Sequence, residues 1–369
     1  MPDALSLFLE LAAIPSPPGR ERAVADRVVA ELRGLGLELD EDDTAGTTGS
    51  EIGNLYCALP GDGNGGTPLF FCAHLDTVLP EGEIVPVVED GIVRNSAGTI
   101  LGADNKAAVV AMVEAVRRLV EDGRPHAGVE LLLTPKEEVG LVGAAAFDES
   151  RLHARVGYVY DMAAPIGTVI MAAPHSRKLD FRFHGRAAHS GMYPEEGRSA
   201  IAAASRAIAD FRLGRLDDET TTNVGTIRGG TARNIVPEWC GFEAEARSLD
   251  DRKLADVVEE MLEAATFAAS LAECDVETEL SEDYRGYRFK RDDAVVRLAV
   301  AALERTGHEV RLETTGGAAD ANVFNERGLE CLNLANGMTD IHTPNEHIAV
   351  ADLDAMVDVT LALIDAAHA

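Results

Sequence analysis

Residues 128–134 read GVELLLT, a mainly apolar run with the length of one strand. Such a strand is expected where helices cover both faces of a parallel sheet. Residues 105–121 are apolar on nearly all sides and are followed by Gly123, which predicts a buried helix. The alternation extends outward to helical spacing at 20–34 and strand-like runs at 53–60, 68–76 and 154–161. We therefore expect an α/β fold with a mostly parallel central sheet flanked by helices.

The pattern changes between residues 175 and 286. Half-exposed strands and amphipathic helices follow one another here in the order β-α-β-β-α-β, which is typical of a ferredoxin-like α+β unit. After residue 287 the helix and strand alternation resumes. We expect one α/β domain formed by residues 1–174 and 287–369, with a smaller α+β domain, 175–286, inserted into it.

Composition limits the classes of partner. The chain has 369 residues, with 33 basic and 63 acidic side chains and a formal charge of −30. This charge repels phosphate backbones and argues against nucleic-acid binding. Hydrophobic residues make up 46% of the chain, enough for a large core. Most of the acidic excess is expected on a solvated surface, while some carboxylates are available to bind cations.

The cysteines and the apolar runs indicate in which cellular compartment the protein is expected. The five cysteines are odd in number and show no CxxC spacing, and Cys57 and Cys72 lie in apolar strand-like runs, so we expect these two to be reduced, buried thiols. The N-terminus has acids within its apolar stretch and lacks the basic segment of a signal peptide. No apolar run reaches the roughly 20 residues of a membrane helix. We expect a cytoplasmic protein with no membrane partner.

The first chemical signal is the predicted strand 68–76, PLFFCAHLD, which ends in His74 and Asp76. Side chains two residues apart leave a strand on the same face. Open α/β sheets bind ligands at the carboxyl edge of their strands, so His74 is well placed as a ligand. Asp76 could hold the other ring nitrogen of His74 and fix its tautomer. Taken alone, the pair fits a structural histidine equally well.

Further carboxylates occupy comparable positions. Asp104 opens the predicted buried helix, where it could also act as an N-cap. Glu137 and Glu138 follow the strand GVELLLT in a loop between two apolar segments. One of them could bind a metal while the other faces a water molecule, although both could also be solvated. Asp161 ends the strand-like run ARVGYVYD.

A late loop, 337–347, supplies two histidines, His342 and His347. One histidine from this loop, together with His74 and the carboxylates, forms a mixed nitrogen and oxygen ligand set suited to zinc, cobalt or manganese. A catalytic zinc usually takes three protein ligands, and five are available here. The pattern therefore predicts two metals that share one carboxylate.

The chain resembles the two-zinc exopeptidases of the peptidase T, carboxypeptidase G and aminoacylase group, and in particular the peptidase T-like branch. The resemblance covers nearly the whole chain, with the same motif order and spacing. The motifs are LAAIPSPPGRE (11–21), AHLDTV (73–78), LGADNKA (101–107), TPKEEVG (134–140), AAHSGMYPEEGRSAI (187–201), GGTARNIVP (229–237), GGAADANVF (316–324) and IHTPNE (341–346).

The resemblance implies a role for each candidate. The implied zinc ligands are His74 and Asp161 at the first site, Glu138 and His342 at the second, and Asp104 as the bridge between them. His342 is preferred over His347 because it lies four residues before Glu346, as in the family motif.

The catalytic roles follow from the same resemblance. Glu137 is implied to be the general base, and Asp76 is implied to orient His74. The peptide bond between Asp104 and Asn105 is implied to be cis.

By resemblance, the inserted domain is a lid that also forms a homodimer. His189 in AAHSG is implied to reach the partner's active site and hold the developing oxyanion. Asn234 in ARNIVP is implied to contact substrate. In GGAAD the spacing differs from the family's GGTDG form, so Gly317 and Asp320 are both candidates for a substrate contact.

The implied activity is hydrolysis of peptide bonds in short peptides by an aminopeptidase or tripeptidase. The implied cofactors are two Zn²⁺ ions, with Co²⁺ or Mn²⁺ as alternatives. One alternative is hydrolysis of N-acyl or N-carbamoyl amino acids at the same two-metal site. Another is a catalytically inactive relative that binds metal or peptide, although the presence of Glu137 beside all five ligands argues against it.

Overall fold

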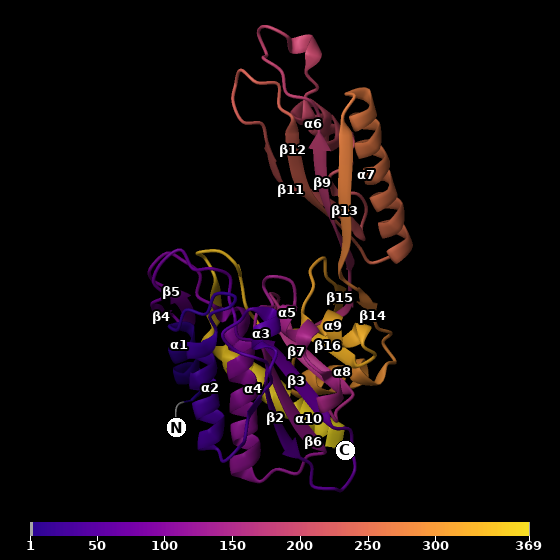
Figure 1. Cartoon of the computed structure of the whole chain (residues 1–369). Helices are drawn as coiled ribbons and strands as arrows, with labels where there is room; N and C mark the ends of the chain where they lie inside the picture. Colours follow the sequence, from indigo (N-terminus) through magenta and orange to yellow (C-terminus); the bar gives the residue numbers. More distant parts are fainter. Residues whose placement is uncertain (1–2, 369) are drawn as a thin grey trace. The chain divides into compact units, whose positions relative to one another are not determined.

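The computed structural model describes residues 3–368. In this part of the chain two compact units are present (Figure 1). Unit 1 comprises 3–172, 288–314 and 318–368, and unit 2 comprises Ala173–Tyr287 with Thr315–Gly317. The short segment 315–317 was expected in the first domain. It belongs to unit 2, where the Arg247 guanidinium donates a hydrogen bond to the Gly316 carbonyl at 3.3 Å.

Unit 1 is built on a central sheet in which the neighbouring strands β6, β3, β7 and β16 are parallel, as expected. Strand β2 is antiparallel to β6, and β8 is antiparallel to β16. In spatial order the strands are β1 (Asp40–Glu41), β2 (Leu55–Pro60), β6 (Gly128–Thr134), β3 (Leu69–His74), β7 (Val156–Met162), β16 (Glu330–Ala335), β8 (Thr168–Ala173) and β14 (Tyr287–Arg288), with β15 (Arg311–Thr314) beside β8.

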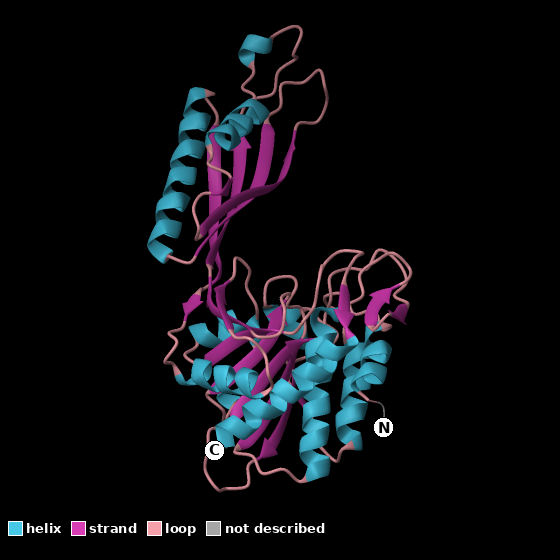
Figure 2. Cartoon of the chain, turned by 180° about the vertical axis from the view of Figure 1, so that it is seen from behind, coloured by secondary structure: helices cyan, strands magenta, loops and turns pink. Residues whose placement is uncertain are grey.

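Helices cover this sheet, as the view from behind shows (Figure 2). All six residues of β3 are buried, which requires cover on both faces. Phe70 and Phe71 point to opposite faces because side chains alternate along a strand. Phe70 packs edge-on against Phe324 of α9 (Asp320–Glu326), with ring centroids 5.3 Å apart. The short helix α5 (Val142–Ala146) contacts α9.

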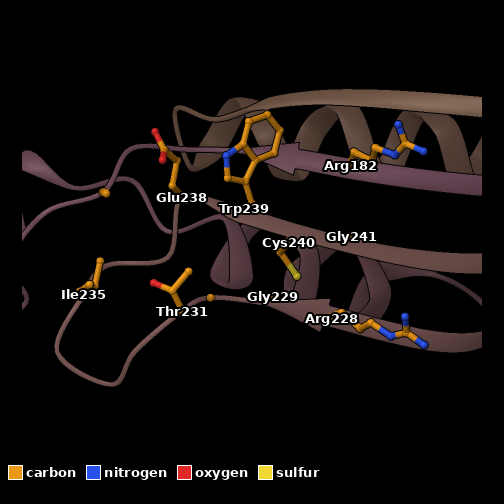
Figure 3. Close-up of a pocket in the computed structure, with 11 residues that line it drawn as sticks. Arg182, Arg228, Gly229, Thr231, Ile235, Glu238, Trp239, Cys240 and Gly241 are labelled. Carbon is orange, nitrogen blue, oxygen red and sulfur yellow. The ribbon is translucent and has the colours of Figure 1, made fainter.

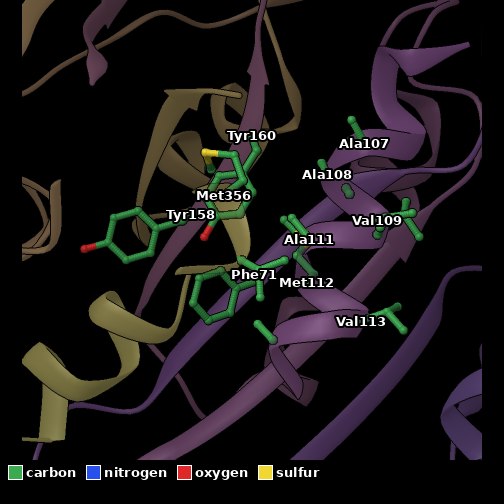
Figure 4. Close-up of a cluster of buried hydrophobic side chains, with 14 of the residues drawn as sticks. Phe71, Ala107, Ala108, Val109, Ala111, Met112, Val113, Tyr158, Tyr160 and Met356 are labelled. Atoms are coloured by element: carbon green, nitrogen blue, oxygen red, sulfur yellow. The ribbon is translucent and has the colours of Figure 1, made fainter. Parts of the chain in front are cut away.

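Phe71 belongs to the main core, in which Tyr158, Tyr160 and Met356 lie beside the apolar helix α4 (Figure 4). Helix α4 spans Ala103–Asp122 and is buried on nearly all sides, as its sequence predicted. It packs against α1 (Ala4–Ala12) and α10 (Val350–His368), and α10 packs against α8 (Ala294–Arg305). Helix α2 (Arg22–Gly34) also contacts α4, and α3 (Ala45–Thr48) lies in the following loop region.

A small sheet of β17 (His347–Ala349), β5 (Ile92–Asn95) and β4 (Pro86–Glu89) was not predicted from sequence. It pairs a late segment with an early one, with His347 opposite Arg94. The sheet matters for the site because β17 directly follows the motif that carries His342.

Unit 2 is an antiparallel sheet in the order β10 (Gly214–Arg215), β11 (Thr220–Gly229), β12 (Trp239–Ser248), β9 (His175–His184) and β13 (Asp275–Tyr284). Helices α6 (Ala200–Asp210) and α7 (Asp251–Leu271) contact the same sheet. Phe181, Phe183 and Phe242 stack within its core. Chain order and pairing match the predicted ferredoxin-like unit, with β10 as a short addition. Every helix within residues 3–368 is too short or too polar for a membrane span.

Candidate metal centre

Three neighbouring parallel strands deliver side chains to one edge of the sheet in unit 1. His74 is the last residue of β3, and Asp161 lies at the end of β7. Glu137 and Glu138 follow shortly after β6, which ends at Thr134. Since β6, β3 and β7 are adjacent and parallel, their carboxyl ends meet at one edge of the sheet, where open α/β sheets bind ligands.

The predicted ligands form two overlapping groups. In each group the ligand atoms all lie within 4.8 Å of one another. The first group is His74, Asp104 and Asp161, and the second is Asp104, Glu138 and His342. Asp104 is common to both, as a bridging carboxylate would be. Glu137 lies in the same cluster, grouped with His74 and Glu138.

Asp104 divides its two oxygens between the histidines. His74 Nε2 lies 3.2 Å from Oδ1, and His342 Nε2 lies 3.1 Å from Oδ2. Among the described residues the Asp104 carboxylate makes no capping hydrogen bond, because both of its oxygens face the histidines, so the N-cap alternative is wrong. The backbone of Asp104 is not helical (ψ 105°), and the Asp104–Asn105 peptide bond is cis, as the resemblance implied.

Asp76 contacts the backbone of Glu137 and Glu138 as well as His74. The nearer partner of His74 Nδ1 is the Asp76 backbone carbonyl at 2.9 Å, while the Asp76 carboxylate lies 3.5 Å away. That fully buried carboxylate instead accepts the backbone N–H groups of Glu137 at 2.9 Å and Glu138 at 3.1 Å. Asp76 thus holds the turn from which both glutamates project.

Two neighbours of the cluster were missed by sequence reasoning. Asn333 on β16 accepts the Asp161 N–H and donates to the Asp161 carbonyl, each at 2.9 Å. Glu346 accepts the backbone N–H of Asp104 at 2.9 Å. The only advance signal for Glu346 was its place in the HTPNE motif, and nothing local marked Asn333.

Electrostatics at the cluster favour bound cations. Burial would lower the pKa of His74, but its hydrogen bonds to Asp104, Asp161 and Asp76 raise that pKa well above its usual value. Hydrogen bonds to Asp104 and Glu138 raise the pKa of His342 to about 10. Without cations, protons on the histidines therefore offset the carboxylate charge.

Two carboxyl groups of the cluster also have raised pKa values. Burial, reinforced by the nearby Asp104 charge, raises the pKa of Asp161 to about 7. Burial followed by the charge of Asp161 raises the pKa of Glu137 well above its usual value. Within residues 3–368, the ion pairs of Asp104, Glu138 and Asp161 are made with histidines only. Buried carboxylates whose charge is balanced by imidazoles alone are a donor set that fits two divalent cations.

The remaining predicted contacts come from both units. His189 and Asn234 are exposed residues of unit 2, on paired loops in which the Ser190 N–H donates to the Asn234 carbonyl at 3.1 Å. Gly317 is also in unit 2. Asp320 is 2% exposed and accepts a hydrogen bond from the Thr134 hydroxyl at 2.6 Å. Its other oxygen is buried without a hydrogen-bond partner among the described residues.

A pocket of about 430 Å³ lies in unit 2 over strands β9, β11 and β12 (Figure 3). Arg182 and Arg228 line one part of it, and Trp239 and Ile235 line another. Because Ile235 follows Asn234 directly, the pocket borders the loop that carries the predicted substrate contact.

Known proteins resemble this chain over nearly its whole length. The uncharacterized protein YqjE of Bacillus subtilis (strain 168) is 40% identical over 363 residues, which are 98% of this chain and 98% of that protein. The crystal structure of aminopeptidase PepT from Bacillus cereus ATCC 10987 is 39% identical, with a TM-score of 0.90, and covers 99% of this chain and 98% of its own.

A tripeptidase structure from Staphylococcus aureus subsp. aureus Mu50 is 32% identical with a TM-score of 0.93, covering 98% of this chain and 96% of its own. The model of peptidase family M20/M25/M40 matches residues 70–366, the region that contains all the cluster residues. The chain therefore belongs to peptidase family M20/M25/M40.

Proposed function

We propose that this protein is a two-zinc aminopeptidase that hydrolyses short peptides, tripeptides among them. The observation that carries the proposal is Asp104, whose two oxygens face two separate histidine-and-carboxylate groups. Such an arrangement is what a pair of cations sharing one carboxylate requires. The choice of substrate draws on two similar structures that are named as an aminopeptidase and a tripeptidase.

The protein's own residues would divide the work as follows. His74 and Asp161 would hold one cation, Glu138 and His342 the other, and Asp104 both. When bound, these cations would polarise the scissile carbonyl and lower the pKa of a water molecule. Glu137, adjacent to Glu138 and grouped with His74, would accept a proton from that water and deliver it to the leaving amine.

Asp76 would keep Glu137 in place, because its carboxylate accepts the Glu137 backbone N–H at 2.9 Å. Positioning of this kind is worth a great deal, since a displacement of about 1 Å can cost on the order of 10²-fold in rate. Burial raises the pKa of Glu137 above its usual value, which suits a group that must both accept and release a proton.

We further propose that unit 2 is a lid that pairs with a second copy of the chain. His189 would hold the developing oxyanion in the partner's site, a contribution of about 10²–10³-fold in turnover. Asn234 would contact substrate, with Gly317 and Asp320 as further candidates. The outer edge of β11 supports pairing, because β10 covers it only at residues 221–222 and Ile227 beyond them is 49% exposed. An uncovered strand edge is suited to association with another chain.

The decisive experiment compares Glu137→Gln with Asp104→Ala. Glu137→Gln should lose nearly all turnover of a tripeptide while retaining two zinc ions per chain, because glutamine cannot accept the proton. Asp104→Ala should lose both ions. Wild-type turnover by Glu137→Gln would refute the assignment of the base, and a wild-type protein that binds no divalent cation would refute the proposed function.

A substrate panel tests the alternative activity. Tripeptides, N-acetyl amino acids and N-carbamoyl amino acids would be compared by kcat/KM on the zinc-loaded protein. We expect tripeptides to be the best class. A clear preference for either modified amino acid would replace the peptidase assignment with an amidohydrolase acting at the same metal pair.

A further inference from the structure

We infer that Glu346 is a positioning residue that holds Asp104 and His342 in the geometry needed to bind both cations. The inference rests on the proposed function, in which Asp104 bridges the two metals. Glu346 makes no contact with the ligand atoms themselves. It acts through the backbone on which the two ligands are carried.

The carboxylate of Glu346 is surrounded by backbone donors from one short segment. Its Oε2 accepts the N–H groups of Leu101 at 2.7 Å and Gly102 at 2.8 Å, and its Oε1 accepts the Asp104 N–H at 2.9 Å. Glu346 is 2% exposed, so water cannot substitute for it as an acceptor. Because both oxygens are used, the segment leading into Asp104 is held at three points.

The same residue is fixed relative to His342. Only three residues separate the two, and the Glu346 N–H donates to the Thr343 carbonyl at 3.1 Å within this turn. Strand β17 begins at the next residue and pairs with β5, which anchors the turn from the other side. His342 itself has φ 62°, an unusual conformation for a residue with a side chain, which indicates that the turn is tightly specified.

Only a carboxylate satisfies this arrangement. Three N–H donors converge on it, and both of its oxygens accept. Glutamine has nearly the same shape, but it presents an NH₂ group to at least one backbone N–H and leaves that donor unpaired. Aspartate keeps the charge but is shorter by one methylene group and cannot span the same donors. Each change should let Asp104 move away from the histidines.

A purely structural role predicts a different result, and Glu130 provides the matched control. Glu130 is also buried, at 4% exposed, and accepts the backbone N–H groups of His153 at 3.0 Å and Ala154 at 2.8 Å. It lies four residues before Thr134 on β6, so it is about 13 Å along the strand from the site edge. Glu130→Gln removes a comparable buried acceptor without touching the metal-binding segments.

The experiment measures Zn²⁺ and Co²⁺ affinity of the metal-free proteins by titration calorimetry. Groups that orient metal ligands typically contribute 10–100-fold to affinity, so Glu346→Gln should bind at least one cation about 10–100-fold more weakly. Saturating metal should restore much of its kcat, because Glu137 is unaltered. Glu130→Gln should keep wild-type affinity. Wild-type affinity in Glu346→Gln, or an equal loss in both variants, would overturn the inference.

The test separates this inference from the proposed function. If the wild-type protein binds no cations, the proposed function fails. If the wild type binds two and Glu346→Gln binds them equally well, only the role of Glu346 fails.

A second measurement needs no variant. In the metal-free wild type, hydrogen exchange should show the amides of Leu101, Gly102 and Asp104 protected by their bonds to Glu346. Exchange as fast as that of exposed loop amides would overturn the inference even if Glu346→Gln did not fold.

Discussion

Asp76→Asn is the substitution whose effect the structure defines most closely. Asp76 is fully buried, and its two oxygens accept the backbone N–H groups of Glu137 at 2.9 Å and Glu138 at 3.1 Å. Asparagine has almost the same volume and shape. It replaces one accepting oxygen with an NH₂ donor, so one of the two backbone N–H groups loses its partner.

The magnitude follows from these contacts. A hydrogen bond to a charged group contributes about 1.5–3 kcal/mol, and a buried donor left unpaired costs about 1–3 kcal/mol. Both ranges describe the loss of the same hydrogen bond, so they are not added together. We therefore expect the free energy of unfolding to fall by about 2–3 kcal/mol. The turn should also shift. Since Glu137 is carried on that turn, a movement of about 1 Å should lower kcat by about 10²-fold.

The assay combines urea unfolding with steady-state hydrolysis of a tripeptide at saturating zinc. Asp42→Asn is the control, because Asp42 Oδ1 accepts the backbone N–H groups of Thr44 at 3.1 Å and Asn54 at 2.8 Å, and its Oδ2 accepts the Asn54 side-chain amide at 3.0 Å, so that asparagine leaves at least one of these donors unpaired. It lies in a loop outside the cluster and should reduce stability without reducing kcat. If Asp76→Asn kept wild-type kcat, or if Asp42→Asn lost as much, the turn would not be held for catalysis by Asp76.

Two further outcomes are expected. Without cations, the pKa of His342 is about 10 and that of Asp161 about 7, so both retain protons near neutral pH that a cation must displace. Affinity for Zn²⁺ should therefore rise as the pH increases from about 6 to 9. Calorimetry in buffers of different ionisation enthalpy measures the protons that are released on binding. An affinity that does not change with pH would contradict this expectation. Gly157→Ala should lower the free energy of unfolding by about 1–3 kcal/mol or more in urea, because overpacking strains a core and the new Cβ would lie 2.2 Å from the Phe70 ring. Gly34→Ala should not lower the free energy of unfolding, because its new Cβ would have no neighbouring atom within 4 Å. Equal stability of the two variants would refute the packing argument.

Several features could be predicted because they are written in local patterns. Mainly apolar runs such as GVELLLT indicated strands buried on both faces, and the change of pattern after residue 175 indicated a ferredoxin-like unit. The candidate ligands were found because His74 and Asp161 lie at strand ends, where parallel strands meet at one edge. The resemblance then selected His342 over His347 and assigned the individual roles, which stay predictions until the variants are measured.

Other features depended on contacts between segments far apart in the chain. Glu346 and Leu101 are 245 positions apart, and Asn333 and Asp161 are 172 apart. The sequence by itself determined the main helices and strands of both domains and which residue types stand at their ends, because both follow from neighbours a few residues away. Only the tertiary structure decided that Asp76 holds the Glu137–Glu138 turn and that Glu346 holds the Asp104 segment. Their partners are backbone N–H groups, which every residue except proline possesses, so no side-chain pattern reveals them before the chain has folded.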